Sequence, residues 1–85
     1  MTRGSDRTPI PYTQTGCVES GRVRDWLIRD DFAFVERNVT GDLDAARDLL
    51  STGSFGTPLL DIGRVIVVGF RPHQLSAALE RTPPR

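Results

Sequence analysis

This sequence of 85 residues contains one cysteine, one histidine and no lysine. A single cysteine excludes an internal disulfide framework. Because the chain also has only one histidine, it cannot supply enough Cys and His ligands to build a metal site within one chain. All eleven basic residues are arginines, which we interpret as a genomic composition bias. Eleven Asp and Glu residues balance them to a net charge of zero, so the charge indicates neither a nucleic-acid nor a membrane partner.

Long apolar segments are also missing. No apolar run approaches the roughly 20 residues that span a bilayer, and no charged start followed by an apolar stretch indicates a signal peptide. A chain without disulfides is typical of the reducing cytoplasm, which is the expected location. The length predicts one domain, which we place over residues 9–82 behind a flexible N-terminal tail over residues 1–8.

Apolar spacing predicts elements in the order β-α-β-α-β-β-α. The expected strands cover residues 9–12, 33–39, 59–62 and 65–68, and the first helix covers residues 18–30. A second helix follows an Asp42 cap and carries Leu43, Ala46, Leu49 and Leu50, and a third begins at Pro72. The first β-α-β unit should be parallel and right-handed, a tight turn at Gly63-Arg64 should join the last two strands, and helices should cover the sheet.

Pro9 and Pro11 conflict with a central first strand, because proline lacks the N–H group that a ladder needs. Alternate residues direct their backbone groups toward the same neighbouring strand. Both missing N–H groups therefore face one side, and Ile10 and Tyr12 can still pair on the other. We predict a short or one-sided first strand.

Cys17 stands where a loop meets the first predicted helix. A thiol at a helix N-terminus feels the positive end of the helix dipole, which favours the thiolate. The alternative is an inert, small apolar residue, the usual role of a lone cysteine. Three residues later, where a two-cysteine redox motif has its second sulfur, the chain has Ser20.

Four segments resemble, in order and spacing, small redoxins of the glutaredoxin type. They are Tyr12-Thr13-Gln14-Thr15-Gly16-Cys17, Val39-Thr40-Gly41-Asp42, Gly56-Thr57-Pro58 and Val68-Gly69-Phe70-Arg71-Pro72. The resemblance implies the minimal thioredoxin fold, an α/β fold with three helices and a four-stranded mixed sheet in the order second, first, third, fourth strand. It also implies that Cys17 is the nucleophile, that Thr57-Pro58 is a cis-proline loop, and that Thr57 offers its backbone to an extended thiol substrate.

The segment Gly69-Phe70-Arg71-Pro72 resembles the NrdH-redoxins, glutaredoxin-like electron donors to ribonucleotide reductase that thioredoxin reductase reduces. Glutathione-using glutaredoxins bind the γ-glutamyl group of glutathione with a Gly-Gly pair and an Asp. This segment has neither the second Gly nor the Asp. The resemblance implies that Gly69, Phe70 and Arg71 line the substrate rim. Without it, Phe70 is equally well a core aromatic and Arg71 a solvated surface residue. Val67 departs from the pattern, which has Trp at that position.

Two residues near Cys17 are expected to weaken its thiolate. Gln14 stands where family members commonly carry a Lys, so at this substrate-binding position it supplies hydrogen bonds without charge. Glu19 adds negative charge in the first helical turn. The helix N-terminus and Arg22 act in the opposite sense, and the sequence leaves the balance open.

Ser20 determines which mechanisms remain. A hydroxyl cannot resolve a mixed disulfide, so Cys17 needs an external thiol, such as glutathione or another low-molecular-weight thiol, as a co-substrate. No bound cofactor and no metal is expected. The resulting hypothesis is a glutaredoxin-like thiol–disulfide oxidoreductase whose partner is a disulfide-containing protein or a small thiol, with thioredoxin reductase or ribonucleotide reductase as further partners.

Two alternatives stay open beside this hypothesis. The first is a redox-inactive or substrate-trapping binding module, and the trapping form corresponds to Ser20 as an engineered replacement of a resolving cysteine. The second is a monothiol iron–sulfur carrier, which Glu19 disfavours because it would place another negative charge beside a cluster rich in negative sulfur.

Overall fold

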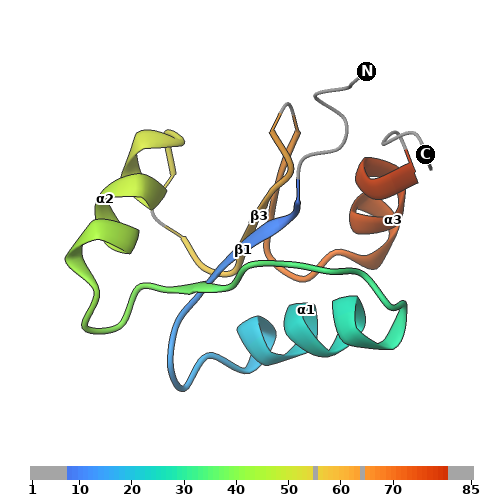
Figure 1. The fold of residues 1–85 in the computed structure, drawn as a ribbon, viewed down its shortest axis with the longest axis horizontal. Coiled ribbons are helices and arrows are strands. Elements are labelled where there is room, and N and C mark those ends of the chain that lie inside the picture. The colour runs from blue at the N-terminus through green and yellow to red at the C-terminus, as the bar shows by residue number, and fades with distance from the viewer. Residues whose placement is uncertain (1–7, 55, 64, 81–85) are drawn as a thin grey trace.

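The computed structural model describes residues 8–54, 56–63 and 65–80, and this part of the chain contains the predicted elements in the predicted order (Figure 1). They are β1 (Ile10–Thr13), α1 (Val18–Arg29), β2 (Arg37–Asn38), α2 (Leu43–Ser51), β3 (Leu59–Asp61), β4 (Ile66–Val68) and α3 (Pro72–Glu80). The predicted tail over residues 1–8 lies, apart from Thr8, outside the described residues, and so does the end of the predicted domain at residues 81–82.

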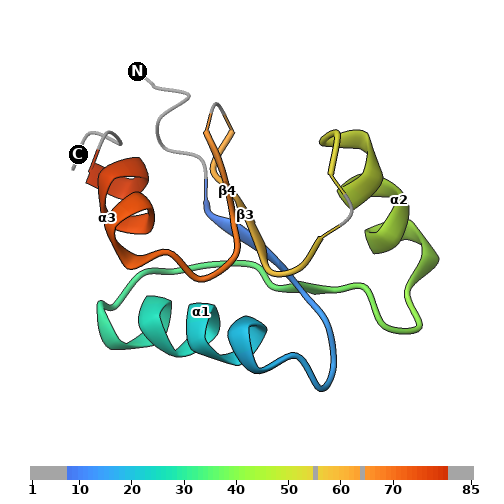
Figure 2. The ribbon, with the colours of Figure 1, turned by 180° about the vertical axis from the view of Figure 1, so that it is seen from behind.

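The strands form one mixed sheet in the order β2-β1-β3-β4, as the resemblance implied. β1 is parallel to β2 and antiparallel to β3, and β3 is antiparallel to β4. Views from both sides place the sheet between α2 on one face and α1 with α3 on the other (Figure 1 and Figure 2). The α/β class and the minimal thioredoxin topology are therefore confirmed.

The prolines at the start of β1 limit its pairing with β2. The Pro9 carbonyl oxygen accepts a hydrogen bond of 3.1 Å from the Val35 N–H group, but neither Pro9 nor Pro11 has an N–H group to donate on this side. The ladder is reduced to two residue pairs, so the predicted strand over residues 33–39 is wrong in length. On the other side Ile10 pairs with β3. The first strand is thus short, as predicted, but it is paired on both sides.

The helices begin at their predicted residues. The Asp42 Oδ1 atom caps α2 by accepting a hydrogen bond of 3.0 Å from the Ala45 N–H group. Pro72 opens α3, where its missing N–H group would have no partner within the helix. α1 ends one residue earlier than predicted, with Asp30 as its C-cap. In the described part of the chain, no helix is both long and apolar enough to cross a membrane.

Two apolar clusters hold the helices against the sheet. The buried members of the larger cluster, under α1 and α3, are Val23, Leu27, Leu60, Val67, Leu75, Ala78 and Leu79. The smaller cluster, under α2, consists of Tyr12, Leu49 and Leu59. This cluster accommodates a narrow stripe of α2, formed by Ala45 and Leu49. The predicted apolar face of α2 is therefore partly wrong, since Leu43 and Leu50 are 74% and 57% exposed.

Candidate functional site

Cys17 lies at the junction between the β1–α1 loop and α1. The loop turns at Gly16, whose φ of 85° is a left-handed conformation that favours glycine. The Cys17 N–H group then donates a hydrogen bond of 3.1 Å to the Gln14 carbonyl oxygen. Cys17 itself has an extended backbone and is the N-cap of α1, and its Sγ atom accepts a hydrogen bond of 3.4 Å from the Ser20 N–H group. The helix start thus points a donor at the sulfur.

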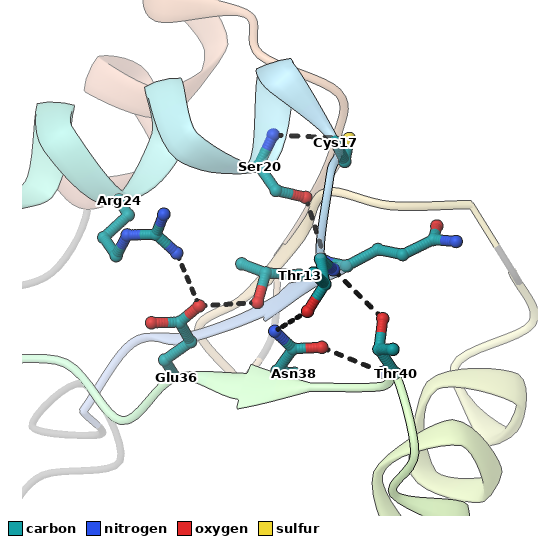
Figure 3. A network of polar contacts seen from close by, with 9 residues as sticks. Thr13, Cys17, Ser20, Arg24, Glu36, Asn38 and Thr40 are labelled. Carbon is teal, nitrogen blue, oxygen red and sulfur yellow. Dashed lines mark hydrogen bonds and ion pairs between the residues drawn. The ribbon is translucent and has the colours of Figure 1, made fainter.

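Ser20 is buried beneath this sulfur, with 1% of its surface exposed. Its Oγ atom accepts a hydrogen bond of 3.1 Å from the Gln14 N–H group. Figure 3 shows Ser20 on the first turn of α1, with its backbone nitrogen directed at Cys17. The serine therefore connects the helix, the nucleophile loop and the thiol.

The Thr57-Pro58 peptide bond is cis, as the resemblance predicted. The Cys17 thiol lies within hydrogen-bond reach of the Thr57 carbonyl oxygen, with 4.0 Å between the sulfur and that oxygen. The Thr57 hydroxyl donates a hydrogen bond of 3.0 Å to Gln14 Oε1. Pro58 is buried, and its carbonyl oxygen accepts a hydrogen bond of 2.7 Å from the Gly69 N–H group.

These contacts close a ring of hydrogen bonds around the sulfur, which we call the Cys17 ring. Cys17 bonds to Thr57, Thr57 to Gln14, Gln14 to Ser20, and Ser20 back to Cys17. Three separate segments of the chain meet in it: the β1–α1 loop, the first turn of α1 and the cis-proline loop. Gln14, Ser20 and Thr57 were each predicted from the sequence as site residues, and the fold brings them together at Cys17.

The environment lowers the pKa of the Cys17 thiol below its ordinary value. The largest cause is the Ser20 hydroxyl, followed by the Ser20 backbone N–H group; burial opposes both, and the Glu19 backbone and Thr57 contribute less. Hydrogen bonds in the first turn of α1, rather than a neighbouring cation, thus stabilise the thiolate. This answers the question that the sequence left open, because the expected weakening by Gln14 and Glu19 does not prevail.

The predicted rim residues lie beyond the cis-proline loop. Gly69 has a φ of 84°, and a Cβ atom there would lie 3.8 Å from both Glu19 Oε1 and Arg71 Nε. Arg71 is exposed and its Nε atom donates a hydrogen bond of 3.3 Å to the Val68 carbonyl oxygen. Phe70 is half-buried and packs against the larger core cluster, which matches the core-aromatic interpretation. Gly69 and Arg71 therefore lie near the first turn of α1, while Phe70, between them in the sequence, packs against the core.

The sequence analysis missed a part-buried network behind the site. The Thr13 hydroxyl, in a residue only 1% exposed, donates a hydrogen bond of 2.6 Å to Glu36 Oε2. Arg24 of α1 binds the same oxygen at 2.7 Å (Figure 3). The network ties α1 to the sheet just behind the nucleophile. A glutamate in the otherwise largely apolar segment before β2 was the available signal.

A second missed network holds the outer side of the nucleophile loop. The Thr15 N–H group donates a hydrogen bond of 3.0 Å to Thr40 Oγ1, and Asn38 Nδ2 donates one of 3.0 Å to Thr15 Oγ1. Asn38 Oδ1 in turn accepts a hydrogen bond of 2.8 Å from the Thr40 N–H group (Figure 3). The loop before Cys17 is thus fixed from both sides. Among the described residues, no group of three or more His, Cys, Asp or Glu side chains could hold a metal ion.

Known structures resemble this chain over most of its length. The crystal structure of the thioredoxin-like protein BC3987 matches with a TM-score of 0.77 and 30% sequence identity, covering 82% of this chain and 97% of that one. Its T8A mutant matches with a TM-score of 0.80 and 29% identity, covering 85% and 99%. The glutaredoxin-like protein NrdH-redoxin from Escherichia coli matches with a TM-score of 0.74 and 26% identity, covering 92% and 97%. No protein-family model and no curated protein matches the sequence significantly.

Proposed function

The chain belongs to the glutaredoxin and NrdH-redoxin family of thioredoxin-like proteins, and from this we propose that it is a thiol–disulfide oxidoreductase with Cys17 as its nucleophile. The observation that supports the proposal best is the Cys17 ring, which holds a partly accessible thiol of lowered pKa beside a cis-proline loop. A thiolate that is both accessible and stabilised is the form of cysteine that attacks disulfides.

The proposed reaction has two exchange steps. In the first, the Cys17 thiolate attacks one sulfur of a disulfide, which forms a mixed disulfide with Cys17 and releases the other sulfur as a thiolate. In the second, an external thiolate attacks the substrate sulfur of this mixed disulfide, which forms a new disulfide and releases the Cys17 thiolate. Because Ser20 replaces a second cysteine, the external thiol carries out the resolving step.

We propose that the substrate docks along the cis-proline loop. The Thr57 backbone would pair with the extended chain on either side of the substrate disulfide, while the Gln14 side chain holds the Thr57 side chain in place. Val18 and Val68, the sequence neighbours of Cys17 and Gly69, are 70% and 42% exposed. Exposed apolar side chains next to the reactive thiol (Val18) and next to the predicted rim (Val68) favour a protein disulfide as the substrate.

A small thiol such as glutathione is the reductant that we propose, in a reducing compartment such as the cytoplasm. The E. coli relative is described as a glutaredoxin-like protein with a thioredoxin-like activity profile, and such a profile would make thioredoxin reductase the electron source and ribonucleotide reductase a recipient. However, one cysteine cannot form the internal disulfide that a reductase of this kind would reduce. The lone thiol therefore favours a small thiol over thioredoxin reductase.

Turnover tests this proposal. Reduction of 2-hydroxyethyl disulfide by excess glutathione is followed with the wild-type chain and with Cys17→Ser, whose hydroxyl cannot attack a disulfide. The wild-type chain should accelerate the reaction above the uncatalysed rate, and Cys17→Ser should not. Equal rates for the two chains would refute the proposed activity.

A second candidate is a trapping module that binds a disulfide partner covalently but does not release it. The absence of a second cysteine favours it, because no sulfur within the chain can resolve the intermediate. The same assay separates the two candidates. A mixed disulfide on Cys17 that persists in excess glutathione would identify the trap, and rapid regeneration of the free thiol would identify the oxidoreductase.

A further inference from the structure

We propose that a cavity between the C-terminal end of α1 and α3 binds a guanidinium-type organic cation, either free or as an arginine side chain. The cavity, which we call the α1–α3 pocket, has a volume of about 130 Å³ and is lined by Trp26, Asp30, Phe32, Ser76 and Leu79. An α-helix rises about 1.5 Å per residue, so Asp30 lies about 20 Å along α1 from Cys17. The α1–α3 pocket is therefore separate from the Cys17 ring, and the proposal goes beyond the proposed function.

The aromatic wall of the pocket is fixed by the way in which α1 ends. Asp31 has a left-handed backbone with a φ of 64°, and its N–H group donates a hydrogen bond of 3.0 Å to the Ile28 carbonyl oxygen. The Phe32 N–H group donates one of 2.9 Å to the Leu27 carbonyl oxygen. This pair of bonds is the Schellman motif, which turns the chain back at a helix end. Phe32 thereby stacks on Trp26, with ring centroids 6.1 Å apart and 16° between the planes, so the wall is formed without a ligand.

The charges at this end of α1 favour a cation. The C-terminus of a helix carries the negative end of the helix dipole, where a carboxylate is unfavourable. Asp30 is nevertheless the C-cap of α1, and Asp31 follows it. Within the described residues, the ion pairs include neither of them. Arg29, the basic residue of the last turn, does not line the pocket. A bound cation would therefore offset negative charge from two carboxylates and from the helix end.

The lining residues match the parts of an arginine side chain. A cation is attracted to the face of an indole ring, which Trp26 supplies. A guanidinium group is planar and has five N–H donors and no acceptor, and Asp30 and Ser76 bring a carboxylate and a hydroxyl that accept hydrogen bonds. Leu79 offers an apolar contact to the aliphatic stem. An anion would be repelled by Asp30, and a neutral molecule would lose the attraction to both the carboxylate and the ring.

Trp26 reports on the pocket directly, because it lines the pocket and is the only tryptophan. The wild-type chain is titrated with N-ethylguanidinium at millimolar concentrations, well below those that unfold proteins. The emission of Trp26 and the NMR shift of its indole N–H group should both change and reach saturation. N-ethylurea, a neutral analogue of the same shape, should change neither. An indole signal that does not respond to the cation, or responds equally to both compounds, would overturn the proposal.

Asp30→Asn removes the charge of the proposed site and keeps its shape. Its affinity for N-ethylguanidinium should be about threefold to tenfold lower than that of the wild-type chain, through loss of a charge-assisted hydrogen bond at an exposed residue. Asp44→Asn is the matched control, since it removes the charge of another exposed carboxylate, in the first turn of α2. Its affinity should stay within about twofold of the wild-type value. Equal weakening in both variants would show general charge attraction and contradict a site at Asp30.

Two peptides identify the source of the cation. One is a blocked tripeptide with a central arginine, and the other has citrulline in its place, which is the neutral urea analogue of arginine. Displacement of N-ethylguanidinium by the arginine peptide alone would assign the pocket to an arginine side chain, whereas displacement by neither peptide would assign it to a free cation. Displacement by both peptides would contradict recognition of positive charge. None of these readouts depends on the reactivity of Cys17, so failure here leaves the proposed function intact.

Discussion

Replacing Glu36 with alanine should destabilise the fold more than any other change to a partly exposed charged residue in the described structure. The substitution leaves the buried Thr13 hydroxyl without its acceptor, and it leaves Arg24 without its partner. A hydrogen bond to a charged group contributes about 1.5–3 kcal/mol. The ion pair adds at most about 1 kcal/mol, because the Arg24 and Glu36 side chains are 40% and 26% exposed.

The expected loss is therefore about 2–3 kcal/mol of unfolding free energy. This is a large part of the total, since a domain of this length has about 4–13 kcal/mol at typical values per residue. Urea unfolding followed by the fluorescence of Trp26, the only tryptophan, measures the change. Trp26 stacks on Phe32 with ring centroids 6.1 Å apart, so unfolding should alter its emission.

Asp48→Ala is the control for this measurement. It removes an ion pair of similar length, 3.0 Å to Arg37, whose acceptor side chain is 54% exposed and bonds no buried hydroxyl. It should change the unfolding free energy by no more than about 0.5–1 kcal/mol. A Glu36→Ala chain that loses no more stability than Asp48→Ala, with an unchanged denaturant slope, would refute the role of the buried hydrogen bond.

Three further outcomes are expected. Leu27→Ala should cost about 2–5 kcal/mol in urea unfolding, because Leu27 is fully buried in the larger core cluster; a cost below that of Leu50→Ala, at an exposed site, would contradict this. Asp42→Ala should cost about 1 kcal/mol through loss of the α2 cap, whereas Asp42→Asn should retain most of the stability. The folded-state pKa of Cys17 lies below its unfolded value. Ionisation of Cys17 therefore stabilises the fold, fully at pH values above the unfolded pKa, and this contribution is lost as the pH falls through the folded pKa. The stability difference between the wild-type chain and Cys17→Ala should grow as pH rises through that window.

Local sequence signals were sufficient to predict the order of the elements. Asp42 and Pro72 mark helix starts through their own backbone chemistry, and the apolar spacing needs no knowledge of the partner elements. The length of β2 could not be predicted in this way. The length of β2 depends on which neighbouring strand faces the side of β1 where Pro9 and Pro11 lack N–H groups. That neighbour is decided by the parallel pairing of segments more than twenty residues apart.

The candidate site was predictable only in part for a similar reason. The motif resemblance placed Cys17, Thr57 and Pro58 together, and the structure agrees with that placement. The roles of the polar side chains depend on contacts across the fold, such as the one between Thr57 and Gln14, which are 43 positions apart. The sequence identified Ser20 by the sulfur that it lacks, whereas its burial and its hydrogen bonds give it a place in the Cys17 ring.

The reactivity of Cys17 is the central claim, and intact mass spectrometry tests it most directly. The wild-type chain is incubated near neutral pH with oxidised glutathione and, separately, with 2-hydroxyethyl disulfide. Cys17→Ser and a urea-unfolded wild-type sample serve as controls. The account predicts one mixed disulfide on the folded wild-type chain, formed faster than on the unfolded chain and removed by added thiol, and none on Cys17→Ser. A folded chain that stays unmodified while the unfolded chain reacts would contradict it.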